Sequence, residues 1–385
     1  MLLITMGQGD MVWEKFGHNS LWIHDPERGT DTAYNYGMFD FNQPGFLGRF
    51  LRGRWIYWME GFPAVPMIDF YRQTNRSVWV QELNLLPAQK RELRDFLEWN
   101  ARPENRDYRY DYFHDNCSTR IRDALDRALG GALRAATGDS LTDKSFRWHS
   151  RRLVADDRAS YAGMNAGLGP AADGRITAWD EMFIPMKLQE HLRSVQTTDA
   201  TGRPVPLVAS EEQLFAAMGR APERPAPPRW TVWFALVGLV LGGSVATLSR
   251  LVRRVRGARF GVAALSALWS LLAGFGGLLL LLLWTLTDHA IAFRNENLLQ
   301  LNPLGLALLL LLPPLAYGAR WAARPAVWVA AAMVALSLLG IVLGLLPGWI
   351  QGNAEMIALA LPAHLGMFAA ALHLRRTLPA APRRI

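Results

Sequence analysis

A single cysteine stands in the stretch Asp115-Asn116-Cys117-Ser118-Thr119-Arg120 of this 385-residue chain. Asp115 and Asn116 are favourable N-cap residues, and apolar residues then recur at helical spacing until Gly130-Gly131 ends the pattern. The sequence therefore predicts a helix that begins at Cys117. The positive end of the helix dipole and the free backbone N–H groups of the first turn favour a thiolate, so we expect a nucleophilic thiol with a lowered pKa.

A histidine far upstream is the predicted base. His18 precedes a predicted strand at 20–24, and residues 32–37 alternate as its antiparallel partner after a turn at 25–29. If this sheet packs on the helix of Cys117, the imidazole reaches the sulfur and forms an activated pair. The opposing interpretation is a loop histidine beside a buried, inert cysteine.

A third polar group usually accepts the other N–H of the imidazole. The nearest candidates are Asn35, on the neighbouring predicted strand, and Asp40, just past its end. We favour Asn35 as the third catalytic residue, because Asp40 also suits a turn. Asp40 and the capping residue Asn116 are retained as accessory candidates.

The rest of the N-terminal half indicates a mixed α+β domain with an antiparallel sheet. Residues 77–86 alternate like a strand, and a helix is expected from Pro87 onward. Residues 50–62 mix arginines with aromatic side chains. Such a segment suits lipid headgroups or an acyl groove, and equally an ordinary strand pair with aromatic core residues.

The C-terminal half predicts an all-α membrane bundle of about five helices. Its apolar segments each approach the ~20 residues that a span requires. Arginines cluster after the first, third and fifth segments, which places the C-terminus in the cytoplasm and the N-terminal half on the outer face of the membrane. This arginine pattern is that of membrane loops rather than of a nucleic-acid site. The segments are 230–249, 261–287, 302–319, 327–348 and 356–374.

Four regions follow from these patterns. We expect a periplasmic thiol-enzyme domain at 1–195, a proline-rich linker at 196–229, a transmembrane domain at 230–376 and a cytoplasmic tail at 377–385. The first residues lack a basic region, a long apolar run and a cleavage site, so we expect a signal segment upstream of this sequence.

Three polar residues in the loop between the second and third apolar segments, on the same predicted side as the thiol domain, are accessory candidates. They either help to bind a headgroup or cap the ends of the membrane helices. One cysteine excludes an intramolecular disulfide, the histidines lack the spacing of metal ligands, and no cofactor is expected. The three loop residues are His289, Asn295 and Asn297.

Several motifs resemble the Lnb family of bacterial membrane proteins, which includes a lipoprotein N-acyltransferase. The resemblance spans most of the chain. Its motifs are Gly17-His18-Asn19-Ser20, the stretch from Tyr34 to Phe41, the stretch from Arg109 to Leu125 and Asn295-Glu296-Asn297-Leu298-Leu299.

The resemblance implies a circularly permuted papain-like, NlpC/P60-related head, in which His18 precedes the nucleophile Cys117. It also implies transfer of an acyl chain from a phospholipid, through a Cys117 thioester, to the N-terminal amine of a bacterial lipoprotein. Two other functions stay open. One is a cysteine hydrolase of the envelope, either a cell-wall amidase or peptidase or a phospholipase, and the other is a non-catalytic binding module.

Overall fold

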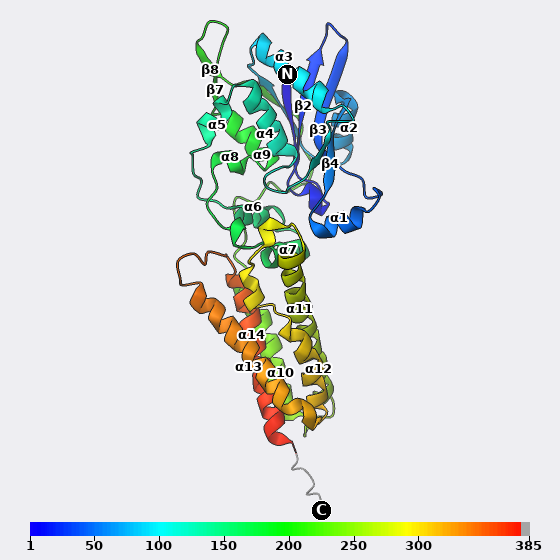
Figure 1. Ribbon diagram of the computed structural model, residues 1–385, viewed down its shortest axis with the longest axis vertical. Coiled ribbons are helices and arrows are strands. Elements are labelled where there is room, and N and C mark those ends of the chain that lie inside the picture. Colours follow the sequence, from blue (N-terminus) through cyan, green and yellow to red (C-terminus); the bar gives the residue numbers. More distant parts are fainter. Residues whose placement is uncertain (379–385) are drawn as a thin grey trace, which may run out of the picture. The chain divides into compact units, whose positions relative to one another are not determined.

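The structure, a computed structural model, describes residues 1–378 (Figure 1). It divides into two compact units. The first comprises residues 1–156 and 175–226, and the second comprises residues 157–174 and the chain from Pro227 onward. Except for its first two residues, the predicted tail at 377–385 lies outside the described residues.

An antiparallel sheet forms the centre of the first unit, with its seven strands in the order β6-β4-β3-β2-β1-β5-β9. The strands predicted at 20–24, 32–37 and 77–86 are confirmed, as is the mixed α+β class of a sheet-rich N-terminal domain. The strands are β1 (Leu2–Met6), β2 (His18–Asp25), β3 (Thr30–Met38), β4 (Ile56–Pro63), β5 (Val78–Leu83), β6 (Asp107–Arg109) and β9 (Val208–Phe215).

Strand β1 lies inside the sheet, between β2 and β5. Because side chains alternate along a strand, Leu3 points to one face and Ile4 to the other, and both are fully buried. The apolar sequence of β1 is thus explained by helices that cover both faces of the sheet.

Helices α3 (Pro87–Asn100) and α4 (Cys117–Ala128) cover the face that contains Leu3, and α2 (Ala64–Gln73) covers the face that contains Ile4. Ile121 and Leu125 of α4 are fully buried in the core, as their helical spacing predicted. The other helices of this unit are η1 (Val12–Glu14), α1 (Phe46–Arg52), α5 (Ala132–Thr137), α6 (Phe146–Leu153), α8 (Ala178–Glu181) and α9 (Pro185–Leu192).

The structure differs from the predicted linker at 196–229. Strands β7 (Gln196–Thr198) and β8 (Pro204–Pro206) form a hairpin, and β9 pairs with β5 at the edge of the main sheet. β9 is mostly exposed, so it lacks the apolar alternation that marks a strand in the sequence. The connection without helix or strand is therefore limited to residues 216–230.

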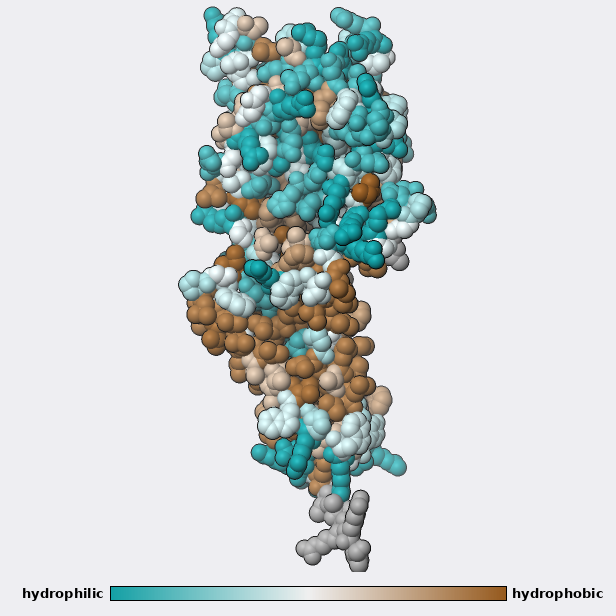
Figure 2. All heavy atoms as spheres, viewed as in Figure 1, coloured by the Kyte–Doolittle hydropathy of each residue, from teal (hydrophilic) through white to brown (hydrophobic). Residues whose placement is uncertain are grey.

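Five helical segments among the described residues are long and apolar enough to cross a membrane, which confirms the predicted number. Their surface is mainly apolar, whereas that of the first unit is mainly polar (Figure 2). The segments are Thr231–Leu251, Ala258–Leu286, Glu296–Ala316, Arg320–Leu343 and Ala354–Thr377. The corresponding helices are α10 (Thr231–Leu251), α11 (Ala258–Leu286), α12 (Leu304–Ala316), α13 (Arg320–Leu343) and α14 (Ala354–Thr377).

Glycines bring α10 and α14 into backbone contact. A Cβ atom added to Gly242 would lie 2.2 Å from the carbonyl oxygen of Pro362, and one added to Gly366 would lie 2.2 Å from that of Gly242. Such distances exclude any side chain, so this pair of helices requires glycine at both positions.

The second unit also contains α7 (Arg158–Gly167), which the sequence placed in the head at 1–195. Tyr161 Oη and Asn165 Nδ2 of α7 both hydrogen-bond to the buried carboxylate of Glu355 in α14. A hydrogen-bonded carboxylate on another helix is not visible in the periodicity of α7 itself. This explains why sequence patterns assigned α7 to the wrong unit.

Candidate active site

Asn116 fixes the start of α4. Its Oδ1 accepts hydrogen bonds from two backbone N–H groups of the first turn, at 2.9 Å each. Its Nδ2 donates to the carbonyl oxygens of Tyr112, at 2.8 Å, and Phe183, at 2.9 Å. Asn116 is thus a buried N-cap that holds Cys117 in the first turn of the helix, where the sequence predicted it.

His18, the first residue of β2, lies beside Asn35 of β3, with 3.1 Å between Nε2 of the imidazole and Oδ1 of the amide. Asn35 Nδ2 donates to the carbonyl oxygen of Ala33 at 3.0 Å, which orients the amide so that Oδ1 faces the imidazole. Ser20 Oγ donates to the same Oδ1. Because that oxygen can only accept, the neutral imidazole carries its proton on Nε2 and its lone pair on Nδ1.

The sulfur of Cys117 lies against the start of β2. Helix α4 packs on β2, and the backbone N–H groups of Asn19, Ser118 and Cys117 lie near enough to the sulfur to lower the pKa of the thiol. Asn19 directly follows His18 in the chain. Within residues 1–378 the structure records no hydrogen bond between the thiol and the imidazole.

The prediction of a lowered thiol pKa is wrong for this structure. Burial raises the pKa of Cys117 to about 11 from its ordinary value of 9.0, although the nearby N–H groups and the charge of Arg76 act in the opposite direction. Burial also lowers the pKa of His18 to about 4; Arg76 adds to this shift, and the hydrogen bond to Asn35 opposes it. The helix start acts as predicted, but removal of the sulfur from water outweighs it. The thiol and the imidazole are therefore both neutral at physiological pH.

Arg76 supplies a buried positive charge to this site. Its Nε donates to the carbonyl oxygen of Gly7 at 2.9 Å, and its guanidinium carbon lies 4.8 Å from the centre of the Tyr71 ring. Tyr71 in turn stacks on the imidazole of His18, with ring centres 6.3 Å apart. The charge disfavours an imidazolium at His18 and favours a thiolate at Cys117.

Tyrosine side chains lie near Cys117 in the core of the first unit. A Cβ atom added to Gly37, which has φ +90°, would lie 3.4 Å from Cβ of Cys117. Burial raises the pKa of Tyr108 and Tyr110 well above its usual value, and negative charge on Cys117 adds to the shift. The ring of Tyr110 stacks on that of Tyr57, with centres 4.2 Å apart. Cys117 therefore packs against the same core cluster as these tyrosines.

Asp40 takes a different position from Asn35. It is exposed, and its Oδ1 accepts a hydrogen bond from the backbone N–H of Asn42 at 2.8 Å. This contact is that of a turn. Of the two candidates for the third residue, the structure brings only Asn35 into hydrogen-bond distance of His18.

The candidates in the membrane loop bind α7 within the second unit. Asn295 Nδ2 donates to the carbonyl oxygen of Ala166 at 2.9 Å, and Asn297 Nδ2 donates to the same oxygen at 3.0 Å. Both side chains thus cap carbonyls at the end of α7. His289 is the N-cap residue of the short helix η3 (Ala290–Ala292).

Sequence reasoning missed Arg76 and Tyr71. Both lie between predicted elements rather than in a motif, and their roles depend on contacts with Gly7 and His18 that no local pattern contains. The sequence contains only a weak signal for them. Arg76 directly precedes an apolar strand, but only the structure shows that its side chain is buried.

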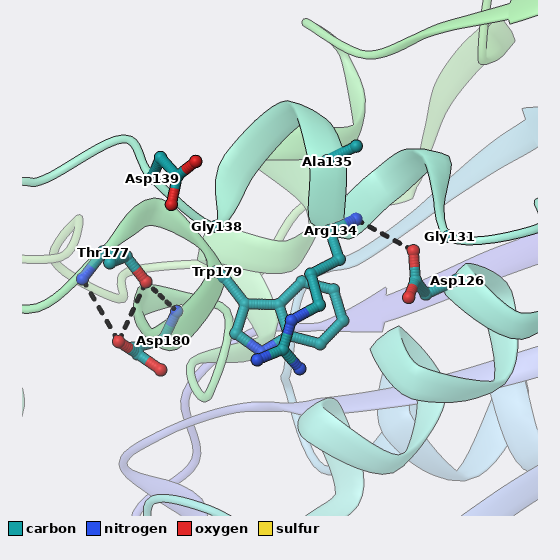
Figure 3. A pocket seen from close by; sticks show the side chains of 9 residues that line it. All are labelled: Asp126, Gly131, Arg134, Ala135, Gly138, Asp139, Thr177, Trp179 and Asp180. Atoms are coloured by element: carbon teal, nitrogen blue, oxygen red, sulfur yellow. Dashed lines mark hydrogen bonds between the residues drawn. The ribbon is translucent and has the colours of Figure 1, made fainter.

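The described part of the first unit also contains a cavity of about 460 Å³ near the end of α4 (Figure 3). Polar groups of its wall are already paired with one another: the backbone N–H of Arg134 donates to Asp126, and Thr177 and Asp180 form a capping box. None of the predicted catalytic residues lines this cavity.

No group of three or more His, Cys, Asp or Glu side chains within residues 1–378 is arranged to hold a metal ion.

Residues 1–155 match the Lnb N-terminal periplasmic domain family. This part of the chain is an Lnb N-terminal periplasmic domain. The match contains His18, Asn35, Arg76 and Cys117, so the candidate site lies entirely within the Lnb domain. No curated protein and no solved structure matches the chain. The Lnb domain and the five candidate spans together identify an envelope membrane protein.

Proposed function

We propose that the protein is a membrane-bound thiol acyltransferase in which Cys117 is the nucleophile, His18 the general base and Asn35 the residue that orients the base. The observation that carries this proposal is the hydrogen bond between His18 Nε2 and Asn35 Oδ1, in a site where α4 begins at a thiol. This bond leaves Nδ1 as the basic nitrogen, and it matches the pairing of base and orienting group that thiol enzymes use.

The first half-reaction acylates Cys117. His18 Nδ1 accepts the thiol proton as the sulfur attacks the carbonyl carbon of a phospholipid ester. The ester C–O bond breaks, His18 returns the proton to the departing oxygen, and a lysophospholipid leaves. Proton transfer accompanies attack in this scheme, because the resting thiol and imidazole are both neutral.

The second half-reaction moves the acyl chain to an amine. The N-terminal amine of a bacterial lipoprotein attacks the thioester carbon, His18 removes a proton from this amine, and the C–S bond breaks as the sulfur regains its proton. Backbone N–H groups at the start of α4 and at Asn19 are suitable donors to the oxyanion in both halves. The chemistry requires no cofactor.

The proposal includes the fold and the location. We assign the first unit to a permuted papain-like, NlpC/P60-related architecture, because the histidine strand precedes the cysteine helix in the chain. The arginine-rich loops support a location in the bacterial inner membrane with a cytoplasmic C-terminus. Donor and acceptor lipids are then held in the membrane that the protein spans.

The test measures N-acylation of a reporter lipoprotein by mass spectrometry, in cells that lack another N-acyltransferase. The wild type should restore the N-acylated product, and Cys117→Ala and His18→Ala should each abolish it. His24→Ala is the matched control, since this exposed histidine lies on the same strand and hydrogen-bonds to Asp31. N-acylation that persists in Cys117→Ala would exclude the proposal.

The same samples separate the other two functions. Free fatty acid or cleaved cell-wall peptide, formed without an amine acceptor and dependent on Cys117, would indicate a cysteine hydrolase. A Cys117→Ala variant that supports growth as well as the wild type, with no change in lipid or peptide products, would indicate a binding module.

A further inference from the structure

The first unit carries an exposed apolar surface that the proposed chemistry does not use. We call it the α1 rim and define it by six side chains, each between 39% and 58% exposed. They are Met11, Val12, Trp13, Phe41, Phe50 and Leu51. A cluster of large apolar side chains at this exposure is a feature of binding surfaces rather than of ordinary protein surface.

The α1 rim is one continuous surface, because its aromatic rings contact one another across three segments of the chain. Trp13 packs edge-on against Phe41, with ring centres 6.0 Å apart, and Phe41 packs against Phe46 at 5.4 Å. Phe46 stacks near Phe50 at 5.9 Å. Residues from η1, from the turn after β3 and from α1 therefore form a single patch.

This patch leads inward to the candidate active site. Phe50 stacks on the buried ring of Trp55 at 5.0 Å, Trp55 lies 6.1 Å from Tyr110, and Tyr110 lies 6.5 Å from Tyr108. A Cβ atom added to Gly37 would lie 3.9 Å from Tyr108 Oη and 3.4 Å from Cβ of Cys117, so the series ends near the thiol. An unbroken series of aromatic rings thus leads from the exposed rim to the region of the thiol.

Acidic residues adjoin the first two segments of the rim: Asp10, which pairs with Arg220, Glu14, which pairs with Arg76, and Asp40. The α1 segment, in contrast, carries only positive charges. Residues 41–59 contain Arg49, Arg52 and Arg54 and no aspartate or glutamate. Aromatic and aliphatic side chains beside arginines form the composition that binds the interface of an anionic bilayer, where the rings enter between headgroups and the arginines contact phosphates.

We propose that the α1 rim inserts into the surface of an anionic phospholipid bilayer. A bilayer is always close to this unit, because a connection of residues 216–230 joins it to the first candidate span. Contact with the bilayer would cover the exposed rings and place the aromatic series at the lipid surface. This role does not depend on which reaction Cys117 performs.

The lone cysteine makes a direct test practical. In a Cys117→Ser background the full chain has no other thiol, so Leu51→Cys introduces one site for an environment-sensitive fluorophore. Phe41→Cys is a second reporter on the rim, and Leu141→Cys is the control, since Leu141 is 60% exposed but lies outside the rim. The labelled proteins are placed in nanodiscs of phosphatidylcholine with phosphatidylglycerol, with or without lipids that carry a spin-label quencher on the acyl chain.

Quenching of about twofold or more is expected at positions 51 and 41, with little at 141. Nanodiscs without phosphatidylglycerol, or the double variant Arg52→Glu with Arg54→Glu, should reduce quenching at position 51. Equal quenching at positions 51 and 141 would overturn the proposal. So would a blue-shifted emission at 51 that the lipid quencher leaves unchanged, because it would show that protein covers the rim.

Discussion

The resting state of Cys117 can be tested without knowledge of any substrate. With a pKa of about 11, roughly one thiol in a thousand is ionised at pH 8, compared with roughly one in ten at the ordinary value of 9.0. The thiolate of a less acidic thiol is intrinsically more nucleophilic, which offsets about eightfold of this hundredfold difference. The raised pKa alone should therefore make alkylation of Cys117 at pH 8 about tenfold slower than that of an unperturbed cysteine.

The assay follows modification of the purified protein by iodoacetamide between pH 7 and pH 10, with intact mass as the readout. Each modified molecule reports Cys117, because the chain has no second cysteine. The logarithm of the rate should rise by about one for each pH unit up to pH 10, without levelling. The denaturant-unfolded chain is the control, and its rate should level near pH 9. Restricted access to the sulfur changes the height of the native curve but not its shape.

A native curve that levels below pH 9 would refute this reasoning. It would mean that the N–H groups at the start of α4 outweigh burial, and that the protein holds a thiolate before any acyl donor binds. The scheme of concerted proton transfer would then have to be replaced by attack from a preformed ion pair.

Arg76→Gln should slow alkylation of Cys117 at every pH below 10, because it removes a positive charge that stabilises the thiolate. Arg76→Lys keeps the charge and should retain most of the wild-type rate. Equal rates in the two variants would contradict this prediction. Asn116→Ala should lower the melting temperature of the first unit by roughly 6–12 °C, because it removes a helix cap worth about 1 kcal/mol and leaves two carbonyl oxygens without their hydrogen-bond donor at a cost of about 2 kcal/mol. Asn116→Ser should recover the contribution of the cap. A decrease of less than about 2 °C in Asn116→Ala would be inconsistent with these contacts. As the pH falls, His18 is protonated in the unfolded chain before it is protonated in the native protein, because its native pKa is about 4. Acidification from about pH 6.5 to pH 4 should therefore lower the free energy of unfolding by up to about 3 kcal/mol. In thermal scans, the melting temperature of His18→Gln should depend less on pH than that of the wild type.

The elements with strong periodicity were predictable from sequence. The alternation at 20–24 and 32–37, the apolar stripe after Cys117 and the five apolar runs each have a local pattern that matches the observed element. The start of α4 was predictable for the same reason, because the cap residue Asn116 directly precedes it.

Long-range contacts account for what the sequence did not reveal. Strand β1 is too short to show its role until β2 and β5 are seen on either side, and β9 is mostly exposed. For residues 50–62 the structure shows strand residues of the core, and the alternative of a lipid-binding segment stays a prediction. Trp55 and Met59 are buried near or in strand β4, as in an ordinary strand pair, whereas Phe50 in α1 is exposed. The thiol pKa was mispredicted because desolvation depends on the whole neighbourhood of a sulfur and not on its position in a helix.

The glycine contacts between α10 and α14 have a consequence for biosynthesis. These helices are the first and last of the five candidate spans, and their backbones touch at Gly242 and Gly366. A ribosome releases α10 early, but the surface that fits it emerges only when the final span is made. The bundle therefore cannot complete its packing during translation of the earlier spans. A chain that stops before α14 would leave the glycine face of α10 without the helix that fits it.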